Sequence, residues 1–540
     1  MRRISWLKRS PRRLTECNNF IYGVERLLML PNRFRWVFCQ LEALQDCLPS
    51  SVRRILAELP ESLDETYERI LREIKRPSRA HARRLLQCLV VAVRPLRVEE
   101  LAELLAYDFD ATEGGIPKVN PHWRWEDHEQ AVLSTCSSLI AVVRDGRRRL
   151  VQFSHFSVKE FLTSSRLAIS GGDVAHHCVS LELAHTLLAQ ACLGTLLSLD
   201  DKAGNDGSSF PLAEYAAQHW VAHAQVDKVS LRVQAGMQQL FDPSRPYLAS
   251  WIQLNNPDKY WDSIRLPLID PVATSLYFAA LCGFRGLVEH LLMKHPEHVD
   301  AIGGGRGAPL HAASALNRVE VAQLLLEQGG DVDVGGFFKR TALHVAALEG
   351  HLEMVRFLLD HGADVDSRQE NFWTPLHMAA WRGYANVSQT LLEYKADANS
   401  QDDKGRVPLH RVSEHSGKGR DYPGVVQVLL EHGADVEETD EEGTTPLHLA
   451  SSSEGKTEVV RLLLDHGMNV DAMDKRGRTP LHLAVSNRRK EVVRLLLDHG
   501  ASADADGESG RAPLQVALKH GNDEIVQMLT EHGAQLHREL

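Results

Sequence analysis

Cysteine is missing from nearly all of the second half of this 540-residue chain. All eight cysteines lie at or before residue 282, and no two of them form a C-x-x-C pair. That distribution argues against a disulfide framework or a zinc site, and it fits buried thiols in a reducing compartment. Long apolar runs are missing too, so we expect no membrane partner. We expect a cytoplasmic protein, with the nucleus as an alternative.

The N-terminal stretch MRRISWLKRSPRR also lacks the apolar core of a secretion signal. An organelle transit peptide is an alternative, since the stretch is rich in arginine and has no acidic residue before Glu16. Pro11 and the shortness of the stretch favour a disordered basic arm instead. We assign that arm to residues 1–33.

Motifs of catalysis are absent as well. The sequence has no G-x-S-x-G elbow, no H-E-x-x-H pair, no protein-kinase set and no Walker A loop, G-x-x-x-x-G-K-[ST]. The glycine-rich GGGRG at 303–307 lacks the lysine and hydroxyl of a phosphate loop, so we interpret it as a turn. We therefore expect a protein that is not an enzyme and has no cofactor.

Positive charge is scarce in the second half. Residues 271–540 hold 27 Lys and Arg against 40 Asp and Glu, a net charge of −13, whereas residues 1–270 hold 34 against 32. Duplex binding depends on neutralising phosphates, so this balance argues against nucleic acid as a partner of the second half.

What the second half does contain is a repeated phrase. It reads APLHAA at 308, TALHVAA at 341, TPLHMAA at 374, VPLH at 407, TPLHLA at 445 and 479, and APLQVA at 512, with a weaker TSLYFAA at 274. From 308 onward the spacings are 33, 33, 33, 38, 34 and 33 residues. An apolar pattern such as EVVRLLLDHGA follows most copies, and this period predicts stacked supersecondary units.

The copy at 374 shows how each unit specifies a pair of helices. Thr374 supplies a capping hydroxyl, and Pro375 stands at the first helical position, where its missing N–H costs nothing. Leu391 belongs to a second helix with apolar residues at helical spacing. This copy has Lys395 where glycine is usual, so we expect a less sharply defined helix stop here. Other copies end that helix at a glycine: Gly362, Gly433, Gly467, Gly500 and Gly533.

These residues resemble the ankyrin repeat family, whose consensus reads TPLHxAA and then a helix ending LLLxxGA. The resemblance covers residues 271–540 as eight repeats. It implies helix pairs with β-hairpin fingers, and a concave surface of fingers and inner helices that binds a protein partner. The copy at 407 departs from the pattern through the insertion HSGKGRDYPG and through Arg411-Val412-Ser413 in place of the usual alanines. Gln515 and a polar tail suit the last copy to a capping role.

The first half predicts helices followed by a hairpin. In residues 34–170, SSLIAVVRDGRRRLVQFSH gives two β-rich runs around Asp145-Gly146, and HFSVKEFL starts another helix. This order indicates a winged-helix domain, and residues 171–270 continue as a helical connecting domain. The fold class is therefore mainly α: an ankyrin-repeat α-solenoid with β-hairpin fingers, preceded by a helical winged-helix domain and a helical linker.

Two segments of the first half resemble a second family. RFRWVFCQLEALQDCLPSSVRRILAELPESLDETYERIL and VQFSHFSVKEFLTS are similar to the region after the nucleotide-binding domain of fungal NACHT–ankyrin proteins. Those are STAND signalling ATPases, similar in plan to NLR immune receptors, in which the repeats sense a partner. The likeness runs from about Phe34 to FDPSRPYLASW at 241–251. Without a Walker A loop we expect no bound nucleotide, and we interpret the chain as a scaffold or sensor arm of such a system.

Two alternatives stay open. One is a NACHT-type signalling ATPase whose nucleotide-binding half is missing from this sequence. The other is a winged-helix nucleic-acid binder that uses Arg147, Arg148 and Arg149, against which the nearly neutral first half argues. His155 resembles a winged-helix histidine that reaches a bound nucleotide, but without the phosphate loop we interpret it as a structural residue between hairpin and helix.

Histidine recurs in the repeats, and the whole chain holds 27. In the ankyrin family the TPLH histidine bonds to the threonine and to an adjoining loop, so we interpret these residues as structural rather than as a ladder of metal ligands. The histidines in this slot are His311, His344, His377, His410, His448 and His482.

Aromatic residues gather in two neighbouring fingers, where other copies are polar. Phe372 fills a slot, two residues before the threonine position, that holds Gly405, Gly443, Gly477 and Gly510 elsewhere. Exposed aromatic residues are frequent anchors of protein interfaces. The alternative is that the rings pack on one another between adjacent fingers. We predict these partner-binding residues: Phe337, Phe338, Phe372, Trp373, Trp381 and Arg411.

Overall fold

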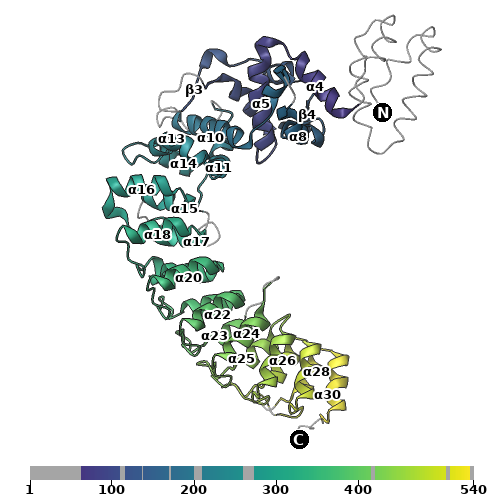
Figure 1. Cartoon of the computed structure of the whole chain (residues 1–540). Coiled ribbons are helices and arrows are strands. Elements are labelled where there is room, and N and C mark those ends of the chain that lie inside the picture. The colour runs from purple at the N-terminus through teal and green to yellow at the C-terminus, as the bar shows by residue number, and fades with distance from the viewer. Residues whose placement is uncertain are drawn as a thin grey trace, which may run out of the picture. The chain divides into compact units, whose positions relative to one another are not determined.

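The computed structural model describes residues 62–109, 116–136, 138–146, 148–169, 172–199, 210–258, 273–414, 420–505, 507 and 511–534. The predicted basic arm at 1–33 lies outside these residues. The chain divides into two compact units, residues 1–257 and 258–540. The described part is mainly helical, as the sequence predicts (Figure 1).

The first unit combines short helices with two small sheets. Its helices are α4 (Leu63–Glu73), α5 (Arg79–Val91), α6 (Val98–Glu103), α7 (His128–Cys136), α8 (Phe156–Leu162), α9 (Ser165–Ile169), α10 (Leu181–Leu197), α11 (Ala213–Ala224), α12 (Val229–Arg232), α13 (Gln234–Leu240) and α14 (Tyr247–Leu254). Its strands are β1 (Leu96–Arg97), β2 (Tyr107–Asp108), β3 (Lys118–Val119), β4 (Ile140–Asp145) and β5 (Arg148–Phe153).

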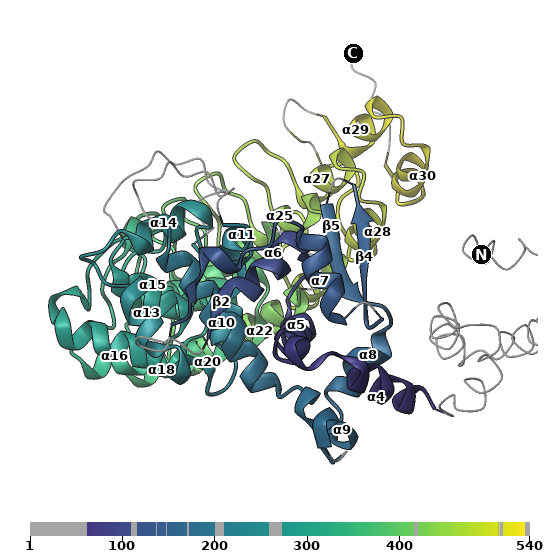
Figure 2. The ribbon, with the colours of Figure 1, turned by 90° about the horizontal axis from the view of Figure 1, so that it is seen from above.

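The predicted hairpin is present as the wing of this unit. Strands β4 and β5 pair antiparallel from Ile140–Phe153 to Asp145–Arg148 (Figure 2). Strand β1 joins the other edge of β5. Gly146 has a φ of 59°, the left-handed conformation that tight hairpin turns require. Helix α8 follows the hairpin directly, as predicted.

Helix α10 is the apolar centre of the first unit. It packs against α5 and α11, and its buried residues include Leu188, Cys192 and Leu196. By length and composition the stretch Leu181–Ser198 is also apolar enough to cross a membrane, which our reading of the sequence did not anticipate. Its packing inside the unit accounts for that apolar character. Because α5 and α10 belong to different predicted segments, residues on both sides of 170 share one core.

The second unit is a stack of eight helix pairs. Several of these helices are labelled in Figure 1, from α15 to α30. The first four pairs are α15 (Ser275–Cys282) with α16 (Arg285–Lys294), α17 (Pro309–Ala315) with α18 (Val319–Glu327), α19 (Ala342–Glu349) with α20 (Leu352–Asp360), and α21 (Pro375–Arg382) with α22 (Ala385–Glu393). The other four are α23 (Pro408–Glu414) with α24 (Tyr422–Glu431), α25 (Pro446–Ser452) with α26 (Thr457–Asp465), α27 (Pro480–Ser486) with α28 (Lys490–Asp498), and α29 (Pro513–Lys519) with α30 (Asp523–Glu531).

Each pair buries its apolar face against its neighbours. The first helices of successive pairs contact one another, as α19, α21 and α23 do, and so do second helices such as α20, α22 and α24. Thr374 caps α21 and Pro375 is its first residue, as predicted. Lys395 adopts a φ of 73° and ends α22 with the same backbone bonds as the glycine copies, so the loss of glycine does not loosen this stop. A single helix pair cannot bury its apolar face by itself, which explains why the units stack.

The fingers between pairs are closed mainly by turn hydrogen bonds. The one isolated β-bridge among the described residues joins Gly303 and Gly307, where the sequence predicts a turn. Successive fingers are tied by single backbone bonds, for example from the N–H of Glu441 to the carbonyl oxygen of Lys404 (2.9 Å). These ties hold neighbouring finger tips in register.

Candidate functional site

The TPLH histidines form a buried structural ladder. In His344, Nδ1 accepts from the N–H of Thr341 and lies 2.9 Å from its hydroxyl, while Nε2 donates to the carbonyl oxygen of Trp373 (2.9 Å). His377 bonds in the same way, with its Nε2 donating to the carbonyl oxygen of Arg406 (3.0 Å). Burial lowers the pKa of His344 and His377 to about 4, so both imidazoles are neutral at pH 7. Both ring nitrogens are used, which explains the repeated histidine without a metal.

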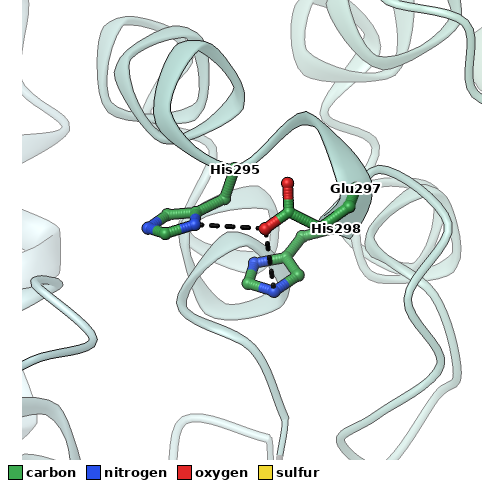
Figure 3. Close-up of side chains that lie close together, drawn as sticks. All are labelled: His295, Glu297 and His298. Atoms are coloured by element: carbon green, nitrogen blue, oxygen red, sulfur yellow. Dashed lines mark hydrogen bonds and ion pairs between the residues drawn. The ribbon is translucent and has the colours of Figure 1, made fainter.

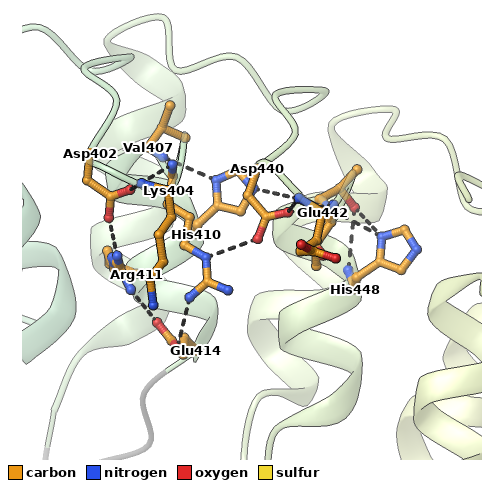
Figure 4. A network of polar contacts seen from close by, with 12 residues as sticks. Asp402, Lys404, Val407, His410, Arg411, Glu414, Asp440, Glu442 and His448 are labelled. Carbon is orange, nitrogen blue, oxygen red and sulfur yellow. Dashed lines mark hydrogen bonds and ion pairs between the residues drawn. The ribbon is translucent and has the colours of Figure 1, made fainter. Parts of the chain in front are cut away.

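A second ladder lies at the turns of the fingers. Three buried aspartates each accept backbone N–H bonds from the residues two and four positions further on. Burial by itself would raise the pKa of each aspartate, but hydrogen bonds from arginine and backbone N–H groups hold it below the ordinary value. The carboxylates are Asp402, Asp440 and Asp474, paired in that order with Arg411, Arg406 and Arg478. Figure 4 shows Asp402 with Arg411, and Asp440 in the next finger.

Trp373 interrupts the arginine pattern. The residue just before the threonine position is arginine in the fingers at 340, 406, 478 and 511, but tryptophan at 373. Arg406 reaches forward to Asp440 in the next finger, with Nε 3.0 Å from Oδ2. An indole in the equivalent place offers no guanidinium to Asp402.

Arg411 supplies the missing charge from helix α23. Its guanidinium binds Asp402 and also Glu414 (2.7 Å), and its Cζ lies 4.4 Å from the centre of a Trp373 ring. Glu414 in turn accepts from Arg406 (3.0 Å), so one network joins two successive fingers (Figure 4). Arg411 is only 6% exposed. We call Phe338, Phe372, Trp373 and Trp381 together the aromatic surface. Arg411 supports this surface from beneath, under the Trp373 ring, and offers little area to a partner.

The two tryptophans pack on each other. Trp373 and Trp381 meet edge to face with ring centres 6.0 Å apart and an interplanar angle of 69°, and both are half-buried. Arg382 lies over the Trp381 ring at 4.8 Å. This contact lies within one repeat, between a finger and the helix that follows it, and is therefore not the packing between adjacent fingers that we gave as an alternative; each ring keeps an exposed portion.

The phenylalanines differ from the tryptophans. Phe338 and Phe372 are 41% and 48% exposed, and their φ angles are 60° and 59°. Left-handed backbone in a bulky residue costs of order 1–3 kcal/mol. The N–H of Glu370 bonds to the carbonyl oxygen of Phe338 (2.9 Å), which ties the two fingers together. Phe337 is half-buried. Two strained, exposed phenylalanines therefore stand on adjacent linked fingers.

Lys456 supports the same region and was not foreseen from the sequence. It is 1% exposed, its Nζ donates to the carbonyl oxygen of Val412 (2.7 Å), and it lies 3.1 Å from the centre of the Tyr422 ring. Burial lowers its pKa to about 7. A buried lysine thus braces α23, the helix that carries Arg411. The only signal in the sequence is a lysine just before α26, and nothing in that pattern shows its burial.

The insertion after α23 is described only in part. Residues 415–419 lie outside the described residues, whereas Arg420 stacks over the Tyr384 ring at 4.4 Å and Asp421 caps α24. The insertion therefore rejoins the stack at the turn between α21 and α22.

Two residues of the first unit that the sequence singled out, His155 and Arg149, have structural partners. His155 caps α8 by accepting from the N–H of Ser157 (3.3 Å). Arg149 forms ion pairs with Glu99 (2.6 Å) and Glu129 (3.0 Å), so its charge is already balanced. Arg147 lies outside the described residues. These contacts give His155 the junction role that we expected.

Two protein families match the chain. The family described as "Ankyrin repeats (3 copies)" matches five overlapping segments, 276–369, 310–402, 376–474, 409–506 and 469–539. The family described as "GPI inositol-deacylase, winged helix domain" matches residues 67–171. The matches cover the repeat stack and the hairpin-containing part of the first unit.

A curated relative and a solved structure are also similar. The azaphilone pigments biosynthesis cluster protein L of Monascus ruber is 30% identical over 292 residues, which are 50% of this chain. The match spans 59% of that relative's length. The crystal structure of the human ASB11 ankyrin repeat domain is 28% identical, with a TM-score of 0.38, and covers 43% of this chain and 100% of the other.

Proposed function

Because the chain is an ankyrin-repeat protein with a winged-helix domain of the GPI inositol-deacylase type, we propose that it is a non-enzymatic protein-interaction scaffold of the cytoplasm. In this proposal the repeats hold a protein partner, and the first unit joins them to a STAND or NLR-like signalling system. The resemblance of the first half to the region after a NACHT module supports that second part.

The observation that carries the proposal is the pair Phe338 and Phe372. A protein seldom keeps two bulky residues in left-handed backbone on exposed turns without a use for them. Aromatic side chains are favoured anchors of interfaces, since they bury much area at low conformational entropy. The half-buried Trp373 and Trp381 extend this surface, and Arg411 holds it from below.

The chemistry of the described side chains supports a non-enzymatic role. The TPLH histidines are neutral and use both ring nitrogens, so they are not placed to exchange protons. Burial raises the pKa of Cys88 and Cys282 to about 12, which leaves their thiols without nucleophilic character at neutral pH. A nucleotide-dependent role of the NACHT type would need a phosphate loop, and the sequence contains no G-x-x-x-x-G-K-[ST] string.

The test removes the exposed rings and keeps the stack. Full-length protein and its Phe338→Ala/Phe372→Ala variant would be used to capture and crosslink partners from an extract of the source organism. The matched control is Met473→Ala/Leu518→Ala, which removes two similarly exposed apolar side chains (56% and 46%) from other repeats. We expect one protein to be recovered at least tenfold less with the phenylalanine variant and equally with the control. Equal recovery with all three proteins would refute the proposal.

A further inference from the structure

Two histidines and a glutamate meet at the end of the first repeat. His295 ends α16, and Glu297 and His298 lie in the 3₁₀ turn that follows, Pro296–His298. Both rings turn toward the Glu297 carboxylate (Figure 3). Its Oε1 is 3.2 Å from Nδ1 of His295 and 3.8 Å from Nε2 of His298. No other group of three His, Cys, Asp or Glu side chains comes together in this way among the described residues.

The backbone prepares this arrangement. Side chains three residues apart nearly eclipse in a 3₁₀ turn, so His295 and His298 lie on one side. The N–H of His298 bonds to the carbonyl oxygen of His295 (3.1 Å), and the fixed φ of Pro296 stiffens the turn. The two imidazoles stack with centres 5.1 Å apart and an interplanar angle of 19°. The turn therefore already gathers the three side chains on one side, and binding one ion requires only that the rings rotate.

We propose that His295, Glu297 and His298 bind a divalent transition-metal ion, with zinc as the best match. Zinc takes nitrogen and oxygen ligands at about 2.0–2.2 Å in a tetrahedron, which places neighbouring ligand atoms about 3.3 Å apart. The Glu297 oxygen lies 3.2 and 3.8 Å from the two imidazole nitrogens, and all three ligand atoms lie within 4.8 Å of one another, so side-chain rotation can bring them onto one ion. Imidazole excludes calcium and magnesium as preferred ions, since these take oxygen ligands.

The site leaves one coordination position open. The histidine side chains are 35% and 33% exposed, and Glu297 is 63% exposed. The fourth position therefore faces solvent and takes water or a donor atom from another molecule. A site of this kind binds its ion reversibly, because no second shell of buried carboxylates orients the imidazoles.

The same chain provides matched controls. His499 lies 3.7 Å from Asp465 and His532 lies 3.9 Å from Asp498, so each pair has one imidazole and one carboxylate but no second histidine. These pairs share the exposure and ligand types of the proposed site and lack its third ligand. They separate a three-ligand site from general binding to surface histidines.

The experiment is a zinc titration of untagged, metal-free full-length protein by calorimetry, compared with His295→Ala, His298→Ala, Glu297→Gln and the control His499→Ala. We expect one tight ion per chain, affinity at least tenfold weaker in each single site variant, and no tight ion in His295→Ala/His298→Ala. Zinc should raise the Tm of wild type and of the control, but not that of the double variant. Circular dichroism confirms that each variant is folded. Unchanged binding in the double variant, equal loss in His499→Ala, or no binding by wild type would overturn the proposal.

Discussion

Two kinds of finger stand side by side in the repeat stack. The finger at 440–445 has its buried Asp440 paired with Arg406 of the preceding finger, the finger at 474–479 has Asp474 paired with its own Arg478, and both tips carry glycine. At 371–374 the residue before the threonine position is Trp373 and the tip holds Phe372. The aspartate of the next finger, Asp402, is still neutralised, because Arg411 approaches it from α23. The difference separates what the fold requires, a paired carboxylate, from what is free to vary, the surface above it.

The two kinds of finger also differ in backbone strain. Gly405, Gly443 and Gly477 adopt φ angles of 70°, 71° and 73° at almost no conformational cost. Phe372 adopts 59° in the equivalent place with an exposed ring. An exposed ring gains little packing energy to offset this backbone strain. The finger with Phe372 at its tip is therefore less stable than a finger with glycine there.

The largest effect should come from removing the relocated arginine. Arg411→Ala leaves the carboxylate of Asp402 buried without a cationic partner, and breaking a buried pair in this way costs about 3–5 kcal/mol. Chemical denaturation of full-length protein measures the loss in the repeat transition. Arg478→Ala is the comparison, because its guanidinium is about a third exposed and its loss admits water to Asp474, so its effect should be smaller. A loss for Arg411→Ala no larger than for Arg478→Ala would show that the relocated arginine stabilises its carboxylate no more than a partly exposed arginine does.

A swap tests the relocation more directly. Trp373→Arg in the Arg411→Ala background restores the arginine position of the regular fingers, from which Arg406 reaches Asp440. We expect the double variant to recover at least half of the stability lost by Arg411→Ala, because the new guanidinium replaces the missing partner of Asp402. Additive or greater destabilisation would show that α23, rather than the finger, determines which arginine pairs with Asp402.

A smaller, pH-dependent effect is expected at Lys456. Burial lowers its pKa to about 7 in the folded protein, whereas an unfolded lysine titrates near 10.4. Between these values the unfolded chain binds more protons, so the free energy of unfolding rises with pH, by at most about 1.4 kcal/mol per unit. Relative to Lys456→Met, wild type should therefore gain stability from pH 7 to pH 9. Parallel curves for the two proteins would show that the Tyr422 ring and Val412 carbonyl keep the ammonium charged throughout.

The regular part of the architecture was predictable from local sequence. Helix pairs, the threonine cap at Thr374 and the histidine ladder follow from signals within one repeat, and the β4–β5 hairpin follows from its turn residues. The relocation of Arg411 was not predictable, because it depends on the distance between a helix and a finger of the same repeat. The burial of Lys456 likewise depends on contacts with the preceding repeat, and the packing of Trp373 on Trp381 depends on how a finger and the helix after it turn their side chains toward each other. Whether a partner touches the aromatic surface stays a prediction.

The smallest effect on stability should be the most informative about function. Phe372→Gly gives the finger tip the residue of its regular neighbours, so it relieves left-handed strain while the unfolded chain gains entropy. We expect stability that is unchanged or up to about 1 kcal/mol higher, measured by denaturation, together with reduced partner capture.

The control Gly443→Ala places a side chain on the same backbone conformation, at a φ of 71°, and should lower stability. A substitution that stabilises the fold and weakens binding would show that the strain at Phe372 is retained for recognition, whereas a destabilising Phe372→Gly would mean that the ring packs in the folded state and belongs to the core of the stack.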